Sequence, residues 1–183
     1  MTRSAARFSI STLALLALAA CAAQPTSPAT APAPPPAIAA PAAPINPDQD
    51  FINRAMTGTG AQAELGRLAQ RQGAAPAVRA FGGQIAAEHA RMHSRLAAVA
   101  QRLGMVPDAA APDLSGLAAL SGAEFDRQFL ADQVKNQREA LGLYESEAQA
   151  GQNPRLRAVA HESLPMLRRD LRRTEELAAR LGT

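Results

Sequence analysis

The sequence has 183 residues, of which 19 % are charged and 3 % are aromatic, and its formal net charge is +3. Arg3 and Arg7 stand in a leader that we expect to be removed, which leaves 17 basic residues against 16 acidic ones. This balance, with so few aromatic rings, excludes the electrostatic pattern of a nucleic-acid-binding protein.

The N-terminal segment is typical of a bacterial lipoprotein signal peptide. Residues 1–20 contain a positive end and a short apolar run, and they finish with Leu-Ala-Ala before Cys21. This ending resembles a lipobox, in which the cysteine becomes the lipidated first residue, so we expect membrane attachment through Cys21. An ordinary cleaved signal followed by a chance cysteine is the alternative. Cys21 is the only cysteine, so lipidation leaves no thiol for disulfides or catalysis.

The next segment separates this anchor from the folded domain. Ala22 follows the cysteine where an aspartate would resemble an inner-membrane retention signal, so we expect the periplasmic face of the outer membrane. Residues 21–47 comprise the lipidated cysteine and a Pro/Ala-rich tether, and proline prevents regular helix or sheet there. We therefore expect the folded domain to span residues 48–183.

Four long helices are predicted from residues that favour helix starts and stops. Asn-Pro pairs precede two helices, glycines follow the helices, and Ser121 with Glu124 forms a predicted capping box. The second and fourth helices begin with a proline and end with Arg-Leu-Gly at positions that are 78 residues apart, which suggests two helix hairpins of similar size. The predicted helices span about residues 47–72, 76–103, 121–150 and 154–181.

The connections predict how these helices are arranged. Two short links require antiparallel neighbours, whereas residues 105–120 are long enough to run back along a helix of about 43 Å. The sequence therefore predicts an all-α, ferritin-like four-helix bundle with a long crossover between the second and third helices. A simple up-down bundle with a loose loop is the alternative.

Several short stretches resemble a known family: residues 63–69 (AELGRLA), 76–81 (PAVRAF), Glu88-His89, 125–129 (FDRQF) and 164–167 (LPML). They resemble the bacterial envelope family catalogued as domain of unknown function 4142, over about residues 51–181. The resemblance implies a ferritin-like bundle on exported or lipid-anchored proteins, without an established activity. It also implies a histidine in each of three helices. Here only His89 remains, because Gln137 and Asp170 stand at the other two positions.

His89 is the main candidate site residue, because it lies on the apolar stripe of the second helix. One interpretation is a core histidine that is hydrogen-bonded to Gln137; the other is a metal ligand. The sequence argues against a di-iron centre, since it contains no Glu-x-x-His motif. Glu64, His89 and Asp170 form the remaining candidate set for a transition metal ion.

The expected function follows from the anchor and the bundle rather than from a catalytic motif. We expect a non-catalytic envelope interaction or stress-related module at the outer membrane, with a peptidoglycan or envelope-protein partner and no nucleic acid. A ferritin-like metal-binding or redox-active protein is the alternative, and a structural spacer is a third. Four arginines on the last helix form either a solvated face or a contact for anionic envelope components: Arg168, Arg169, Arg172 and Arg173.

Overall fold

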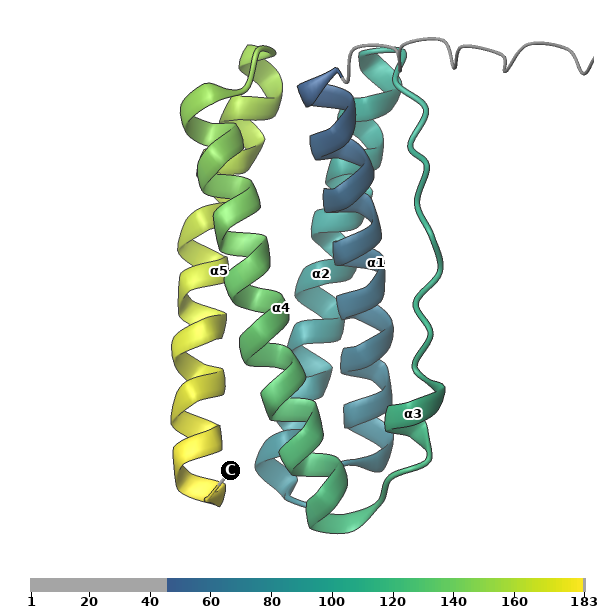
Figure 1. Cartoon of the computed structure of the whole chain (residues 1–183), viewed down its shortest axis with the longest axis vertical. Coiled ribbons are helices and arrows are strands. Elements are labelled where there is room, and N and C mark those ends of the chain that lie inside the picture. Colours follow the sequence, from purple (N-terminus) through teal and green to yellow (C-terminus); the bar gives the residue numbers. More distant parts are fainter. Residues whose placement is uncertain (1–45, 183) are drawn as a thin grey trace, which may run out of the picture. The chain divides into compact units, whose positions relative to one another are not determined.

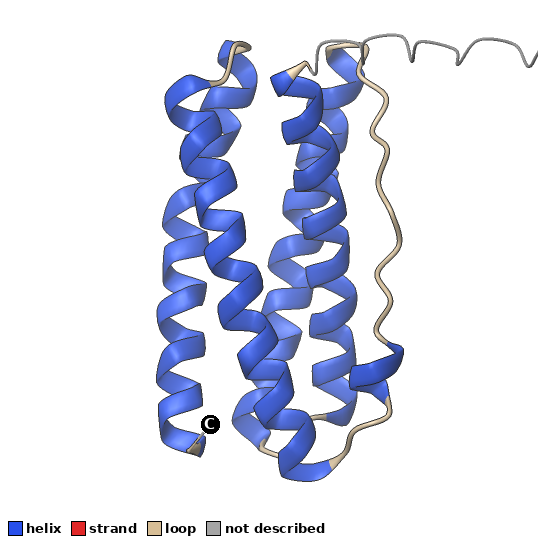
Figure 2. Cartoon of the chain, viewed as in Figure 1, coloured by secondary structure: helices blue, strands red, loops and turns tan. Residues whose placement is uncertain are grey.

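The computed structural model of the chain describes residues 46–182, which form helices and no strand (Figure 2). The predicted signal peptide, Cys21 and the Pro/Ala-rich residues up to 45 lie outside this part of the chain. Within the described residues, no helix combines the length and the apolar character needed to cross a membrane. The helices are α1 (Pro47–Gln72), α2 (Pro76–Arg102), α3 (Ser115–Ala118), α4 (Gly122–Ala150) and α5 (Pro154–Leu181).

The ends of the long helices lie close to the predicted positions, and both predicted asparagine caps make the expected bonds. The Asn46 side chain accepts from two backbone N–H groups in the first turn of α1, at 3.1 and 3.4 Å. Asn153 accepts from one in the first turn of α5, at 2.9 Å. The predicted capping box is wrong, since the Ser121 side chain caps no N–H group. Gly122 follows it with a φ of 61°, outside the helical region.

The long crossover determines the topology. Helices α1 and α2 form one hairpin, α4 and α5 form the other, and residues 103–121 run back along the bundle between them (Figure 1). The single turn of α3 lies near the end of this crossover. Because the crossover returns the chain to the opposite end, α2 and α4 are parallel. The predicted ferritin-like bundle is confirmed over the up-down alternative.

A pair of glycines allows α1 and α2 to approach closely. A Cβ atom on Gly66 would lie 2.6 Å from the Gly82 carbonyl oxygen, and a Cβ atom on Gly82 would lie 2.7 Å from that of Gly66. Only glycine permits this contact between the two backbones. It fixes α2 against α1 about two turns before His89.

The two hairpins repeat one loop structure 78 positions apart, and each supports the loop of the other. Two backbone N–H groups of the α1–α2 loop donate to Asp126 of α4, at 2.9 and 2.8 Å. Two of the α4–α5 loop donate to Asp48 of α1, at 3.0 and 3.2 Å. Arg79 and Arg157 each donate to two carbonyl oxygens of their own loop. We call these places the α1–α2 corner and the α4–α5 corner.

The core consists of two apolar clusters with a polar layer between them. One cluster includes Phe51 and Leu167, and the other includes Phe81 and Phe129. Folds of this type build their ligand and metal sites from side chains that face one another inside the bundle. The polar layer is therefore the level of the bundle at which a binding site is expected. Its buried members come from all four long helices: Thr59, Gln62, His89, Gln133, Gln137, Asp170 and Thr174.

Candidate functional site

Part of the polar layer is a continuous chain of hydrogen bonds between buried side chains. The amide of Gln133 donates to Gln62 at 2.7 Å, and the amide of Gln137 donates to Gln133 at 2.9 Å. The Thr174 hydroxyl completes the chain by donating to Gln137 at 2.9 Å. The predicted hydrogen bond between His89 and Gln137 is therefore wrong, because Gln137 is bonded to Gln133 and Thr174 instead.

His89 lies in the same layer but takes no part in this chain. Its side chain is only 2 % exposed, and among the described residues neither ring nitrogen has a hydrogen-bond partner. Burial lowers the pKa of His89 to about 4, so the ring is neutral at neutral pH and one nitrogen carries a lone pair. A buried polar group without a partner lowers the free energy of unfolding by about 1–3 kcal/mol. The contribution of His89 to folding therefore does not explain why a histidine stands at this position.

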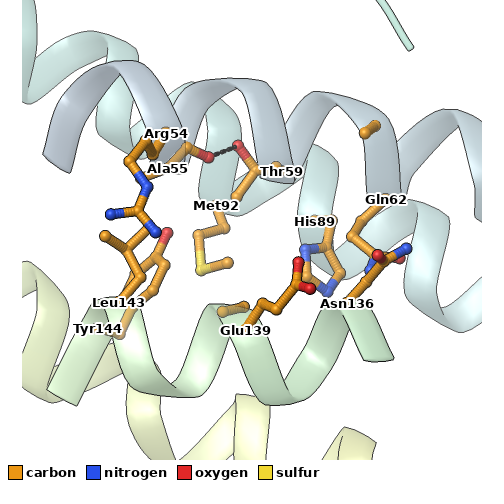
Figure 3. A pocket seen from close by; sticks show the side chains of 13 residues that line it. Arg54, Ala55, Thr59, Gln62, His89, Met92, Asn136, Glu139, Leu143 and Tyr144 are labelled. Carbon is orange, nitrogen blue, oxygen red and sulfur yellow. Dashed lines mark hydrogen bonds between the residues drawn. The ribbon is translucent and has the colours of Figure 1, made fainter. Parts of the chain in front are cut away.

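The His89 ring lines a pocket of about 220 Å³ between α1, α2 and α4 (Figure 3). Met92 lies one turn further along α2 and lines the same pocket, so a nitrogen and a thioether sulfur share one helix face. Glu139 and Tyr144 approach from α4, and the Glu139 carboxylate extends toward the His89 ring in Figure 3. The Tyr144 hydroxyl is buried and has no hydrogen-bond partner within residues 46–182, and burial raises its pKa.

The structure separates Glu64 from His89. Glu64 is exposed on α1, where it forms an ion pair with Arg67 at 2.6 Å, and this hydrogen bond lowers the pKa of Glu64. His93, the other histidine of α2, is turned toward α1, with its Nδ1 atom 3.1 Å from the Thr59 hydroxyl. Neither side chain lines the pocket beside His89.

Asp170 is buried in the polar layer, yet it belongs to a different group of side chains. Arg169 of α5 donates to Glu88 of α2 at 2.8 Å and to Asp170 at 3.2 Å. The second Asp170 oxygen is buried and finds no hydrogen-bond partner in the described part of the chain. Burial first, and Glu88 next, raise the pKa of Asp170 to about 7. Glu64, His89 and Asp170 thus form no common site, and the described residues contain no group of three His, Cys, Asp or Glu side chains that could hold a metal ion.

Most arginines of the basic band on α5 are engaged within the protein. Arg168 pairs with Glu145 at 2.9 Å and Arg169 with Glu88 at 2.8 Å. The Arg173 guanidinium lies over the Phe81 ring, 5.9 Å from its centroid. These contacts tie α5 to its neighbours and favour the interpretation of a paired, solvated face.

Met92 and Tyr144 are site residues that sequence reasoning missed. The sequence placed Met92 on the apolar stripe of α2, one turn after His89, and a thioether at that spacing could have been considered a metal ligand. For Tyr144 no signal was available, because only the packing shows that its hydroxyl is buried without a partner.

Comparisons with known proteins establish the family and the fold. Residues 33–177 match the family described as "Domain of unknown function (DUF4142)". No curated protein matches the chain. Among solved structures, the "DUF305 fragment from Deinococcus radiodurans" is 16 % identical, with a TM-score of 0.67, and the match covers 74 % of this chain and 97 % of that one.

Two further similar structures are described as "CopM in the Cu(I)-bound form" and "CopM in the Ag-bound form (by soaking)". Both are 16 % identical to this chain, with TM-scores of 0.65 and 0.63. Each match covers 73 % of this chain, and 96 % and 95 % of the respective CopM chain. At this identity, the similarity shows a shared helical-bundle fold.

Proposed function

We propose that this chain, which belongs to the family described as "Domain of unknown function (DUF4142)", is a lipid-anchored, non-catalytic envelope protein that binds the soft metal ion Cu(I). The proposal rests on the side chains of this protein. The ligands that we assign are one ring nitrogen of His89 and the thioether sulfur of Met92. Binding takes place in the pocket between α1, α2 and α4.

The unpartnered ring of His89 is the observation that carries this proposal. The neutral imidazole is the form that coordinates metals, and the lowered pKa of His89 keeps it neutral well below pH 7. A bound ion would give one ring nitrogen the partner that the described helices do not supply. The energetic disadvantage of burying this ring is then offset in the bound state.

Met92 determines which ion we propose. Thioether sulfur is a soft ligand that favours Cu(I), whereas the hard cations prefer carboxylate and carbonyl oxygens. Met92 is 7 % exposed and stands on the same helix face as His89, so both donors are shielded from water. Glu139 adds a negative charge at the pocket that favours a cation.

The similar solved structures support the choice of ion at the level of the fold. CopM, a helical bundle similar to this one, is described in Cu(I)-bound and Ag-bound forms. The ligands assigned here rest on this chain alone, because an identity of 16 % transfers no residue from one protein to the other.

The location in the envelope is supported by the sequence ahead of the bundle. The lipobox-like ending before Cys21 favours lipidation, and Ala22 favours sorting to the periplasmic face of the outer membrane. The Pro/Ala-rich residues up to 47 would then hold the metal-binding bundle away from the membrane surface. A peptidoglycan or envelope-protein partner remains part of this proposal.

A Cu(I) competition titration of the full chain under anaerobic conditions tests the proposed function. We expect one Cu(I) per chain, and we expect Met92→Leu to weaken binding at least ten-fold because leucine keeps the volume but removes the sulfur. Met166→Leu makes the same change on α5 outside the pocket and should leave the affinity unchanged. Failure to bind Cu(I), or equal affinity in the two variants, would contradict the proposal.

A further inference from the structure

The two corners support their loops in the same way but differ at one buried position. Ala69 in the α1–α2 corner and Glu147 in the α4–α5 corner stand 78 positions apart. The carbonyl oxygen of each accepts a hydrogen bond from the N–H group of the loop glycine at 2.9 Å. Because the α1–α2 corner has this structure with an alanine, the loop itself does not need the Glu147 carboxylate.

The Glu147 carboxylate is buried and incompletely satisfied. Its residue is 5 % exposed, and its Oε1 atom has no hydrogen-bond partner among the described residues. That atom lies 2.1 Å from the place where a Cβ atom of Gly151 would stand, so glycine there leaves room for the carboxylate. Burial first, then Asp48, raise the pKa of Glu147 to about 7, while Arg157 acts in the opposite direction.

Glu147 faces a surface groove of about 530 Å³ between α1 and α4, which we call the open groove. Phe51 and the small residues Ser146 and Ala150 are among its walls. Two arginines at the groove have acidic partners of their own: Arg54 pairs with Asp50 at 3.5 Å, and Arg138 pairs with Glu175 at 2.8 Å. Neither guanidinium provides the missing hydrogen bond to Glu147.

The corresponding place at the α1–α2 corner is filled by the chain itself. Helix α3 lies beside the end of α1 (Figure 1), and its Leu117 is buried in one cluster with Leu65 and Leu68. The amide of Gln72 donates to two backbone carbonyl oxygens of this segment, those of Ala118 at 2.9 Å and Leu120 at 2.8 Å. A short peptide segment with an apolar anchor therefore fits this geometry.

The differences between the two places indicate what the open groove would accept. An offset of 78 positions places Ala150 where the α1–α2 corner has Gln72, and Glu147 where it has Ala69. Compared with the α1–α2 corner, the open groove lacks the side-chain donor of Gln72 and has the buried carboxylate of Glu147 in addition. A segment docked there must donate hydrogen bonds, and a cationic side chain does so most strongly to a carboxylate.

We propose that the open groove docks a short peptide segment of a partner protein, which places an apolar side chain against Phe51 and a lysine or arginine side chain on Glu147. This interaction uses neither His89 nor Met92, although the open groove shares Arg54, Glu139 and Leu143 with the proposed metal pocket. It would give the bundle a second binding surface at the corner where α1 begins and α4 ends.

Titration of the full chain in detergent micelles at pH 8 with short peptides tests this proposal. The probe is the capped hexapeptide Ser-Gly-Leu-Ala-Lys-Leu, which has the sequence of the α3 segment with one alanine replaced by lysine. We expect saturable changes in the amide NMR signals of Ser146 and Gly151. The same peptide with norleucine in place of lysine should bind at least ten-fold more weakly, because it keeps the length without the charge.

Glu147→Ala is the matching protein variant, since the α1–α2 corner shows that alanine is compatible with this fold. It should lose at least ten-fold in affinity for the lysine peptide, whereas Glu176→Ala, at an exposed glutamate of α5, should not. The proposal is overturned if the lysine peptide fails to bind, if the norleucine peptide binds equally, or if Glu147→Ala retains full affinity. Equal affinity for n-butylammonium alone would also overturn it, because the groove would then recognise a free amine.

Discussion

At residue scale, His89 occupies a position that an apolar side chain would suit better. The equivalent position in the second hairpin, 78 residues later, is Leu167, which is fully buried in the core. His89→Leu should therefore raise the free energy of unfolding by about 1–3 kcal/mol at pH 7, because it removes an unpartnered polar group. Urea denaturation followed by circular dichroism measures this difference. A destabilised variant would show that His89 contributes to folding.

The stability gain of His89→Leu should also depend on pH. The folded protein depresses the pKa of His89 from 6.5 to about 4, so below pH 6.5 the unfolded chain binds a proton that the folded chain does not. The wild type should lose stability as the pH falls from 6.5 toward 4. Since leucine does not titrate, the difference between the two proteins should widen over this range.

Asp170 has the opposite pH dependence. Its pKa is raised from 3.8 to about 7, so between these values the folded protein holds a proton that the unfolded chain has released. The wild type should therefore lose stability as the pH rises from about 4 to 7. Because Asp170→Asn stays neutral, its stability relative to the wild type should increase by about 4 kcal/mol between pH 4 and pH 8. Denaturation curves at pH 4 and pH 8 measure this, and an equal difference at both values would contradict it.

The sequence predicted where the site residues lie along each helix, but not which partners they meet. The apolar stripe correctly placed His89 and Gln137 inside the bundle. Their contact depended on how α4 is rotated against α2 and α5, and that rotation is set by packing over the whole interface. The Gln137 side chain is bonded to Thr174, so it forms no hydrogen bond with His89. Glu64 had an alternative in Arg67, three residues away on its own helix, and forms that pair.

At the scale of elements, the contact between α1 and α2 depends on Gly82. Gly82→Ala would place a methyl group 2.7 Å from backbone atoms of α1, which cannot move independently. We expect a loss of about 3 kcal/mol in the free energy of unfolding, measured by urea denaturation. The control is Gly58→Ala, where a Cβ atom meets nothing within 4 Å and where alanine should stabilise α1 by about 0.5–1 kcal/mol. If both variants lost a similar amount of stability, the close approach of α1 and α2 at Gly82 would not be the cause of the loss.

Helix boundaries were largely predictable because proline, asparagine and glycine act within a single turn. The capping box at Ser121 failed since the left-handed conformation of Gly122 changes how α4 begins. The repeat at 78 positions was visible in the loops and helix ends, and it extends to Asp48 and Asp126. Their role was not evident, because each carboxylate supports a loop of the other hairpin.

At the scale of the whole molecule, the proposed anchor has a direct test. Cys21→Ala should abolish incorporation of labelled palmitate and move the protein out of the detergent phase on Triton X-114 partitioning, because no thiol remains to carry the diacylglycerol group. Ala22→Asp should keep the lipid but shift the protein to the inner-membrane fraction. Unchanged partitioning of Cys21→Ala would contradict lipid anchoring.

The bundle topology could be predicted because the length of one connection distinguishes the two arrangements. A crossover of residues 103–121 spans the bundle, whereas an up-down arrangement needs only a short turn. The pockets could not be predicted in this way. They depend on how tightly the two hairpins pack against each other, and that packing is a property of many side chains together.

The support of each hairpin by the other has a consequence for the order of folding. Asp48 lies in the first turn of α1, and the N–H groups that it binds are 104 and 105 residues further along the chain. A chain that emerges N-terminus first presents this carboxylate early and its partners late. The contact of Asp48 with the α4–α5 loop can therefore form only when nearly the whole domain has appeared. A chain that stops before residue 152 therefore leaves the Asp48 carboxylate without these two N–H donors and open to water instead.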